Sequence, residues 1–220
     1  MMHRKFFSVL AAMCLCCCMH AQLDEGVNRF IQEELRKDAP FYDIGYVSRF
    51  VPETMHMGLG VAGVPARHAF VDRAIEATIA YTCALSVGFL LKFTVVRERP
   101  DMSDSQSFPS GHTLFAFTGA ELTRMDYGWG WGGGAYAVAA LTGAERLWGN
   151  KHWLTDVLAG AGIGILSAQA GCWLLQPVKE LFGIPELDWD GFGTGKVRIA
   201  AAPCVNPLCR TYTAAVAIRF

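Results

Sequence analysis

Two long stretches without a charged residue constrain the fold of this chain more than any other feature of its sequence. Residues 157–175 are nineteen uncharged residues rich in Gly and Ala, and residues 77–91 form a second uncharged run. A membrane-spanning helix needs about 20 predominantly apolar residues, and small residues let helices pack closely. Both runs therefore predict long helices inside a bundle, either in a membrane or in a tight soluble core.

The rest of the pattern predicts an all-α fold, a bundle of about six helices that we expect to be embedded in a membrane. The expected helical segments are 6–21, 47–66, 71–92, 112–125, 131–146 and 156–176. A Gly- and Trp-rich stretch at 126–134 predicts a turn at a membrane interface between the fourth and fifth segments. Apolar residues at helical spacing predict a further, surface helix within 22–45, ended by Pro40.

The two ends of the chain differ from its middle. Arg4 and Lys5 precede a short apolar run, which is the layout of a signal peptide; an uncleaved signal anchor is the alternative. Two short β-type runs after Lys196 flank a turn at Asn206-Pro207 and predict a small hairpin. We therefore divide the chain into a signal peptide or signal anchor at 1–21, a helical bundle at 22–176 and a tail at 177–220.

The charge of the chain excludes one class of partner. Its net charge is -1 and it has no basic run, so we expect no binding to nucleic acid. Charged residues make up 18% of the chain, against about 25% in average soluble domains, which tilts the expectation toward membrane proteins.

Three polar clusters interrupt the apolar pattern, each at an expected helix end. They lie at residues 92–100, 108–113 and 146–156. Taken singly, each has an ordinary interpretation: a helix end whose basic side chains reach toward water, a turn with a helix cap, or an ion pair four residues apart on a helix.

Taken together, the clusters contain the groups needed to bind a phosphoryl group. Lys92, Arg99 and Arg146 supply three cations, and Arg can bind phosphate through two parallel hydrogen bonds. Ser110 adds a hydroxyl. Gly111 belongs to a turn that places backbone N–H groups at a helix N-terminus, where anions bind.

Three further residues of the clusters fit catalytic roles. Asp156 can hold one ring nitrogen of His152 and leave the other nitrogen free to attack phosphorus. His112 can donate a proton to the leaving oxygen. The residues alone therefore suggest cleavage of a phosphate ester through a phosphohistidine.

The order and spacing of the clusters resemble the three signature motifs of the type 2 phosphatidic acid phosphatase superfamily. That family includes lipid phosphate phosphatases, bacterial non-specific acid phosphatases and vanadium haloperoxidases. Its first two motifs, Lys-x6-Arg-Pro and Pro-Ser-Gly-His, match fully at residues 92–100 and 109–112. In the third, Ser-Arg-x5-His-x3-Asp, residues Arg146, His152 and Asp156 match in type and spacing.

The resemblance covers about residues 70–176 and implies the same roles as the chemistry of the residues. His152 would be the nucleophile, Asp156 its orienting partner and His112 the acid, and the phosphate-binding residues would be Lys92, Arg99, Ser110, Gly111 and Arg146. Glu145 stands where the family usually has Ser, which puts a small phosphate or backbone contact in doubt. The family uses no catalytic metal, so we expect no metal and no other cofactor.

The implied function is a metal-independent phosphatase acting on phosphate monoesters or pyrophosphates of lipid-linked or small periplasmic substrates. Two alternatives stay open. One is a vanadate-dependent haloperoxidase-like enzyme, for which this chain is small. The other is a non-catalytic anion-binding membrane protein, in which the spacing of the histidines would be incidental. Vanadate should inhibit a phosphatase as a phosphoryl mimic, but should support halide oxidation in a haloperoxidase.

The six expected segments also predict an orientation. If all six cross a membrane, the three clusters share the non-cytoplasmic face, whereas Arg67, His68 and Arg124 lie on the cytoplasmic face, as the positive-inside trend requires. This favours a bacterial inner-membrane enzyme whose active site faces the periplasm. The alternative is a soluble or peripheral periplasmic protein, because segments 112–125 and 131–146 are short for spans.

The cysteines of the tail bear on this orientation. Cys204 and Cys209 flank the predicted turn and are placed to form a disulfide in an oxidising compartment. Such a disulfide would contradict a six-span arrangement, which puts the tail in the cytoplasm.

Overall fold

A computed structural model describes residues 22–36, 42–184, 199–206 and 211–218 of the chain. The expected segment at 6–21, the end of the first surface helix at Pro40, and Cys209 lie outside the described residues.

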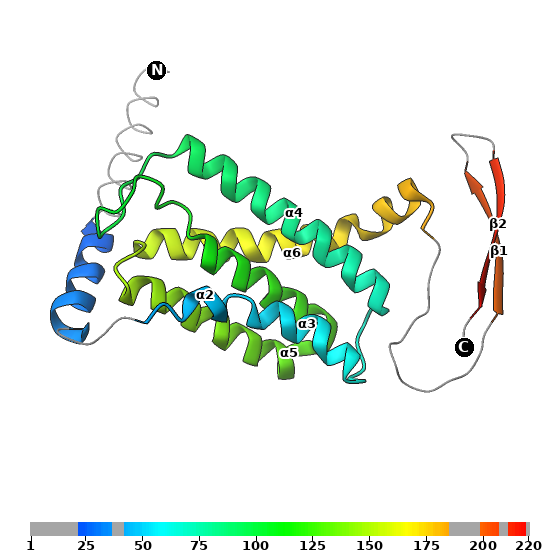
Figure 1. The fold of residues 1–220 in the computed structure, drawn as a ribbon, viewed down its shortest axis with the longest axis horizontal. Coiled ribbons are helices and arrows are strands. Elements are labelled where there is room, and N and C mark those ends of the chain that lie inside the picture. The colour runs from blue at the N-terminus through cyan, green and yellow to red at the C-terminus, as the bar shows by residue number, and fades with distance from the viewer. Residues whose placement is uncertain (1–21, 37–41, 185–198, 207–210, 219–220) are drawn as a thin grey trace, which may run out of the picture.

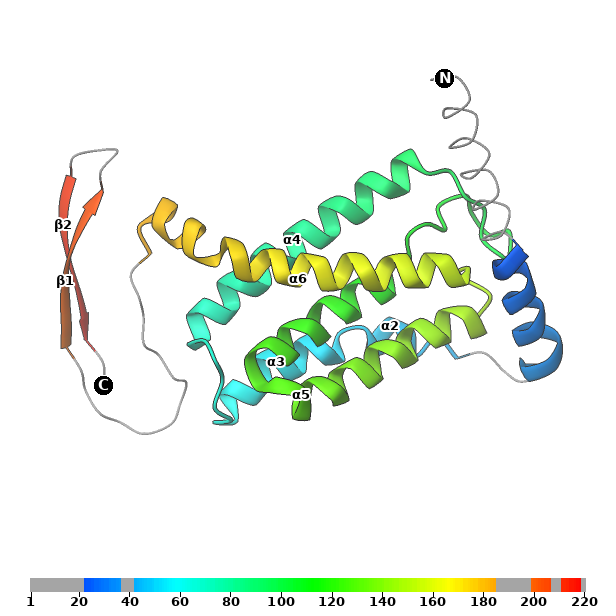
Figure 2. The ribbon, with the colours of Figure 1, turned by 180° about the vertical axis from the view of Figure 1, so that it is seen from behind.

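The described helices form a bundle around α6 (Figures 1 and 2). Residues 22–29 are α-helical and run into the π-helix η1, and five named α-helices follow. Their bounds are η1 Phe30–Arg36, α2 Gly45–Ser48, α3 Val51–Val61, α4 Phe70–Thr94, α5 Gly111–Trp148 and α6 Leu154–Phe182. Helix α6 packs against both α4 and α5, and α3 packs on α5. The all-α bundle expected from the sequence is confirmed.

A line of glycines explains why the Gly-rich run folds at the centre of the bundle. A Cβ atom on Gly160 would lie 2.6 Å from the carbonyl oxygen of Ser110, and one on Gly164 would lie 2.5 Å from that of Leu114. Further along α6, a Cβ on Gly171 would lie 2.8 Å from the backbone oxygen of Glu76 on α4. The backbone of α6 therefore touches both neighbouring helices directly, which only residues without a side chain permit.

Small side chains also fill the core where the three long helices meet. Ala77 and Ala80 of α4, Leu122 of α5 and Ala168 of α6 form one buried cluster. Because three of these four side chains are alanine, the helix axes can approach closely, and Leu122 fills the space that remains.

Helix α5 departs from the prediction of two helices joined by a turn at 126–134. Residues 111–148 are helical except at Gly128, whose φ of 75° and ψ of -175° reverse the chain. The two halves then pack side by side (Figure 2), with Ala116 and Ala120 against Ala135 and Ala139. The turn is this short because glycine tolerates a positive φ and because alanines let the halves come close.

Two other predicted segments have different bounds. The segment expected at 47–66 is divided into α2 and α3 by a turn at 49–50. The helix expected to end at 176 continues through Pro177 to Phe182. The last turns of α6 are anchored to α4, because the buried Lys179 ammonium donates a hydrogen bond to Asp72 at the start of α4, with an N–O distance of 2.7 Å.

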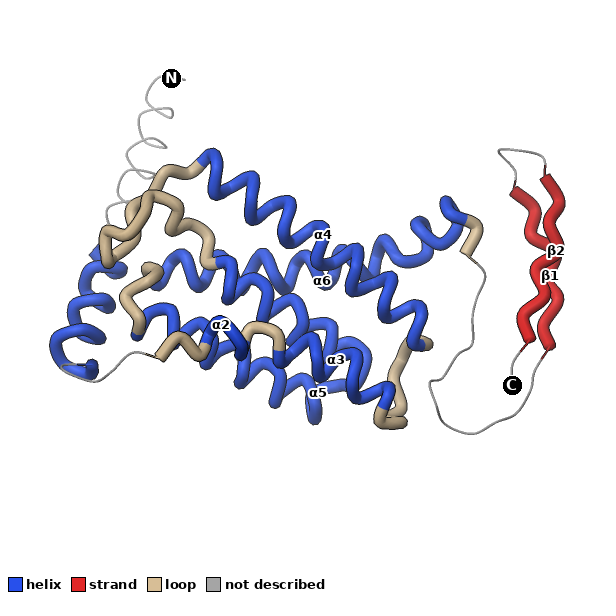
Figure 3. The backbone as a smooth tube through the Cα atoms, in the orientation of Figure 1, coloured by secondary structure: helices blue, strands red, loops and turns tan. Residues whose placement is uncertain are grey.

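The tail contains the two described strands of the chain (Figure 3). Strand β1 Ile199–Asn206 pairs antiparallel with β2 Thr211–Ile218, in a register that begins with Ile199 opposite Ile218. The strands lie where the sequence predicts a hairpin. The pairing of Cys204 with Cys209 stays a prediction.

Helices α4 and α6 are long and apolar enough to cross a membrane, with mean hydropathies of 1.6 and 1.5 over their most apolar windows. Both helices expose large apolar side chains on their outer faces, including Phe89 and Phe93 on α4 and Leu166 and Trp173 on α6. An exposed apolar surface of this kind suits contact with lipid or with another protein.

We predict that Gly164→Ala lowers the free energy of unfolding by about 1–3 kcal/mol, because the new methyl group would push against the backbone of α5. The matched control is Gly162→Ala, at an exposed position of the same helix where a Cβ meets nothing within 4 Å. The control should be more stable by roughly 0.5–1 kcal/mol, because alanine favours helix. Thermal or denaturant unfolding in detergent measures the free energy of unfolding of both variants. An equal change in the two variants would contradict the packing argument.

Candidate active site

The three polar clusters meet at one end of the bundle, where the loop after α4, the start of α5 and the loop before α6 come together (Figure 1). Two hydrogen bonds tie the clusters to each other. The Ser110 amide donates to the Asp156 carbonyl at 3.0 Å, and the Arg99 guanidinium donates to the Lys151 carbonyl at 3.2 Å. Residues more than forty positions apart in the sequence thus share one site.

His152 is buried in this site, and its two ring nitrogens have different neighbours. Nε2 lies 3.4 Å from Nη1 of Arg99. Nδ1 lies 3.5 Å from the Ser107 hydroxyl and 3.7 Å from Oδ2 of Asp156, so the carboxylate is at ion-pair distance, beyond a direct hydrogen bond. Burial lowers the pKa of His152, and the charges of Arg99 and Lys92 act in the same direction. The imidazole is therefore kept neutral, as a nucleophile requires.

Asp156 lies at the start of α6 and is fully buried. Its Oδ2 accepts hydrogen bonds from the Ser107 hydroxyl at 2.5 Å and from the Trp153 amide at 2.9 Å. Its Oδ1 accepts one from Nη1 of Arg97 at 2.6 Å. These three donors hold the carboxylate beside the Nδ1 edge of His152.

Three residues of this hydrogen-bond network are not among those predicted from the sequence. Arg97 and Ser107 contact the Asp156 carboxylate, and Asp24 pairs with Arg97. Arg97 lies inside the first motif and Ser107 lies two residues before the second, and their polar character was a signal for them. Asp24 lies in the polar N-terminal segment, far from any motif, and gave no signal. It is buried, accepts hydrogen bonds from the amide and hydroxyl of Thr155 at 2.9 and 2.5 Å, and pairs with Arg97.

His112 is the second residue of α5, and two arginines surround it. Its Nε2 lies 3.4 Å from Nη1 of Arg49, which is part of the turn between α2 and α3. Burial, the charge of Arg146 and the charge of Arg49 together lower the pKa of His112 to about 4. Without a bound anion the ring is neutral at pH 7.

The start of α5 offers backbone donors next to open space. Ser110 is the N-cap residue, is buried, and its hydroxyl lies 3.0 Å from that of Thr113. A Cβ added to Gly111, the first helical residue, would meet nothing within 4 Å. The first amides of a helix bind anions, and the open space leaves room for one here.

The three predicted cations have partners in the site. Lys92 donates to the carbonyl of Gln106 at 2.8 Å, and Nε of Arg99 lies 2.8 Å from Oδ1 of Asp104. The positive charges of both cations help to lower the pKa of His152.

Arg146 is held by carboxylates instead of facing the site freely. Its Nε and Nη2 donate to the two oxygens of Glu145 at 2.5 and 2.7 Å, and Nη2 also pairs with Asp43. The Glu145 found in place of the family Ser therefore neutralises a predicted phosphate-binding residue. All eight residues predicted from the sequence lie around this end of the bundle, and the roles assigned to them stay proposals.

Comparisons with known proteins agree with the motifs. Residues 73–179 match the model of the PAP2 superfamily. Over 87 residues the chain is 44% identical to the lipid A 1-phosphatase of Porphyromonas gingivalis. The aligned stretch covers 38% of this chain and 19% of that protein. The chain thus spans about a fifth of the length of this curated relative.

A solved structure shares the fold. The crystal structure of Aquifex aeolicus LpxE matches with a TM-score of 0.55 and 21% sequence identity, over 69% of this chain and 95% of that chain.

We predict that Glu145→Ser and Glu145→Gln both tighten the binding of inorganic phosphate, because each removes a charge that competes for Arg146. We expect roughly a tenfold gain, since ~1.4 kcal/mol equals a factor of ten and a hydrogen bond to a charged group is worth about 1.5–3 kcal/mol. Calorimetric titration measures the affinity, with Glu180→Ser at an exposed position of α6 as the control. Unchanged or weaker binding in both Glu145 variants would contradict the competition.

Proposed function

Because the chain belongs to the PAP2 superfamily, we propose that it is a metal-independent phosphatase acting on a phosphorylated lipid through a phosphohistidine. The observation that supports this most is the site itself. A buried, neutral imidazole faces a guanidinium on one side and a fixed carboxylate on the other, beside an unobstructed helix N-terminus.

The proposed reaction begins with the phosphoryl group bound between Arg99, Lys92 and the first amides of α5. Nε2 of His152 attacks phosphorus while the bond from phosphorus to the ester oxygen breaks. His112 gives its proton to that oxygen, and the alcohol leaves. Water, deprotonated by the now neutral His112, then attacks the phosphohistidine and releases inorganic phosphate, which restores both histidines.

Asp156 acts through His152 in this scheme. The imidazole becomes positively charged as it bonds to phosphorus, and a fixed carboxylate 3.7 Å from Nδ1 stabilises that charge. Because Arg97, Ser107 and the Trp153 amide already hold the carboxylate, it does not need to reorganise during the reaction.

Three observations favour a lipid over a small soluble ester. The curated relative is a lipid A 1-phosphatase. Helices α4 and α6 present apolar outer faces of membrane-spanning length. A small apolar cavity between α4 and α5 has Lys92 and Gly111 in its wall, next to Leu85, Phe89 and Leu114. We propose that this cavity accepts the apolar part of the substrate nearest the phosphate.

The proposed substrates are phosphate monoesters or pyrophosphates of lipid-linked molecules, with the protein in a bacterial-type inner membrane and its site facing the periplasm. That orientation follows from the clusters sharing one end of the bundle and from Arg67 and His68 lying in the loop at the opposite end (Figure 1). The three-part division at 1–21, 22–176 and 177–220 is proposed with it.

We predict that His152→Ala lowers phosphate release from a lipid phosphate at least about a thousandfold, because the proposed covalent intermediate forms on the ring that this change removes. Wild-type protein should release phosphate in EDTA, since the proposed chemistry needs no metal. The measurement is phosphate release in detergent from a lipid phosphate and from an aryl phosphate. Gly162→Ala is the folded control, and activity that survives in His152→Ala would refute the nucleophile.

We predict that phosphate binding at pH 8 is accompanied by proton uptake at His112. The pKa of this ring is lowered to about 4 without a ligand, so it is neutral at pH 8, and a bound anion must raise its pKa before it can act as an acid. Calorimetry in buffers of different ionisation enthalpy measures the protons taken up. His112→Ala should take up fewer protons than wild type, and equal uptake would count against the acid role.

A further inference from the structure

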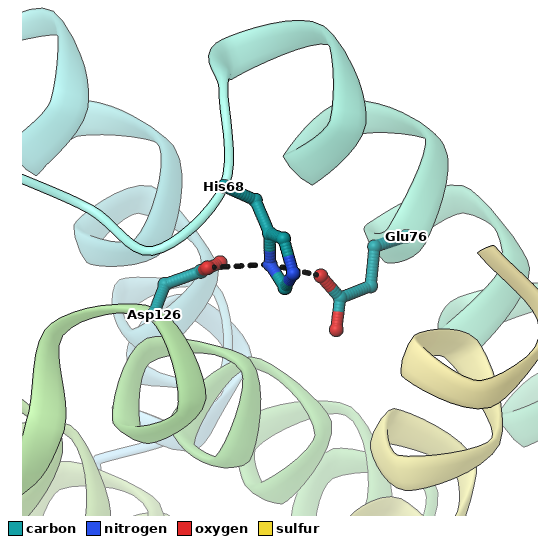
Figure 4. Close-up of side chains that lie close together, drawn as sticks. All are labelled: His68, Glu76 and Asp126. Atoms are coloured by element: carbon teal, nitrogen blue, oxygen red, sulfur yellow. Dashed lines mark hydrogen bonds and ion pairs between the residues drawn. The ribbon is translucent and has the colours of Figure 1, made fainter. Parts of the chain in front are cut away.

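A second polar cluster lies at the end of the bundle opposite the candidate active site. It consists of His68 in the loop before α4, Glu76 on α4, and Asp126 on α5 just before Gly128 (Figure 4). Nδ1 of His68 lies 2.9 Å from Oδ1 of Asp126 and 3.3 Å from Oε2 of Glu76. One nitrogen and two oxygens from three separate elements thus lie within 4.8 Å of one another.

Glu76 is the member of this cluster whose carboxylate has, among the described residues, no hydrogen-bond donor and only one ion-pair partner, His68. Its side chain is 1% exposed, and neither carboxylate oxygen accepts a hydrogen bond from any residue that the structure describes. Nδ1 of His68 is hydrogen-bonded to Asp126 and lies 3.3 Å from Oε2 of Glu76, where it forms an ion pair when the imidazole is protonated but does not point its N–H at that oxygen. The thiol of Cys172, a weak donor, also lies close enough to act on Glu76. A buried carboxylate without donors is costly unless a cation neutralises it.

Asp126 is oriented by groups outside the triad. Its Oδ2 is hydrogen-bonded to Nε2 of the fully buried His56 at 2.7 Å, which leaves Oδ1 turned toward His68. The Arg67 amide donates to the Asp126 carbonyl at 3.0 Å and fixes the loop that carries His68. Metal ligands are commonly held in this way by hydrogen bonds from a second set of residues.

We propose that His68, Glu76 and Asp126 bind a divalent transition metal ion, with zinc as the best fit. Zinc takes imidazole nitrogen and carboxylate oxygen at about 2.0–2.2 Å, in sites with three protein ligands and a water. Ligands at that distance from one ion lie about 3–4 Å apart, and the two distances from His68 Nδ1, 2.9 and 3.3 Å, are close to that spacing. Magnesium and calcium prefer oxygen ligands alone and fit this donor set less well.

The ion would neutralise Glu76 and join three elements that the chain connects only through loops. It would link the loop before α4, the first turns of α4 and the reversal at Gly128. His68 is partly exposed, so an ion can reach the cluster from outside the bundle. The site is separate from the histidines proposed for catalysis, so we expect the ion to stabilise the fold and to take no part in phosphoryl transfer.

The test is zinc binding to the metal-free whole chain in detergent, with Cys172 left in place beside Glu76 and the cysteines outside the bundle (14, 16, 17, 18, 204 and 209) replaced by serine. We expect wild type to bind one tight equivalent of Zn²⁺ by calorimetry and to unfold at a higher temperature when zinc is bound. Glu76→Gln and His68→Ala should weaken that equivalent at least about a hundredfold, since even outer partners of metal ligands are worth about 10–100-fold in affinity. His112→Ala is the matched control and should still bind one tight equivalent of Zn²⁺.

The opposite results overturn the proposal. No tight equivalent in wild type, or an equivalent that survives in Glu76→Gln, would mean that a protonated His68 shared between two carboxylates accounts for the cluster. Loss of the equivalent in His112→Ala would place the zinc at the candidate active site instead. Should His68→Ala fail to fold, the nearly isosteric Glu76→Gln and the wild-type stoichiometry still decide the question.

Discussion

The candidate active site is organised around one buried charge. A carboxylate with no exposure to water must find its donors within the protein, and Asp156 finds them in Arg97, Ser107 and the Trp153 amide. To supply these donors, the loop after α4 has to fold back onto the start of α6. Arg97 then brings in Asp24 from the N-terminal helix. The position of His152 is one consequence of this network.

The sequence was sufficient to predict groups whose spacing is local. The motif residues, the helices α4 and α6 and the position of the hairpin could all be read from runs and short patterns. Residues whose partners lie far away in the sequence could not be predicted in this way. Asp24 lies 131 positions from the Thr155 that it binds, and nothing in a polar N-terminal segment distinguishes it from a solvated carboxylate.

The same limit applies to α5 and to the second polar cluster. The Gly- and Trp-rich stretch indicated a reversal, but only backbone geometry shows that Gly128 alone makes it. His68 was interpreted as one of several basic residues on a membrane face, because its carboxylate partners come from two other helices. Glu145 was recognised as a departure from the family pattern, but its contact with Arg146 depends on side-chain orientation that no spacing encodes.

The glycine contacts of α6 have a consequence for how such a protein can change over evolutionary time. Backbone atoms set the separation of α5 and α6 at Gly160 and Gly164, so the second and third motifs are held in register by parts of the chain that side-chain substitutions do not alter. The outer faces of the same helices are free to vary in shape and bulk. New lipid specificities could therefore be selected on the outside of the bundle while the distances between reacting groups stay constant.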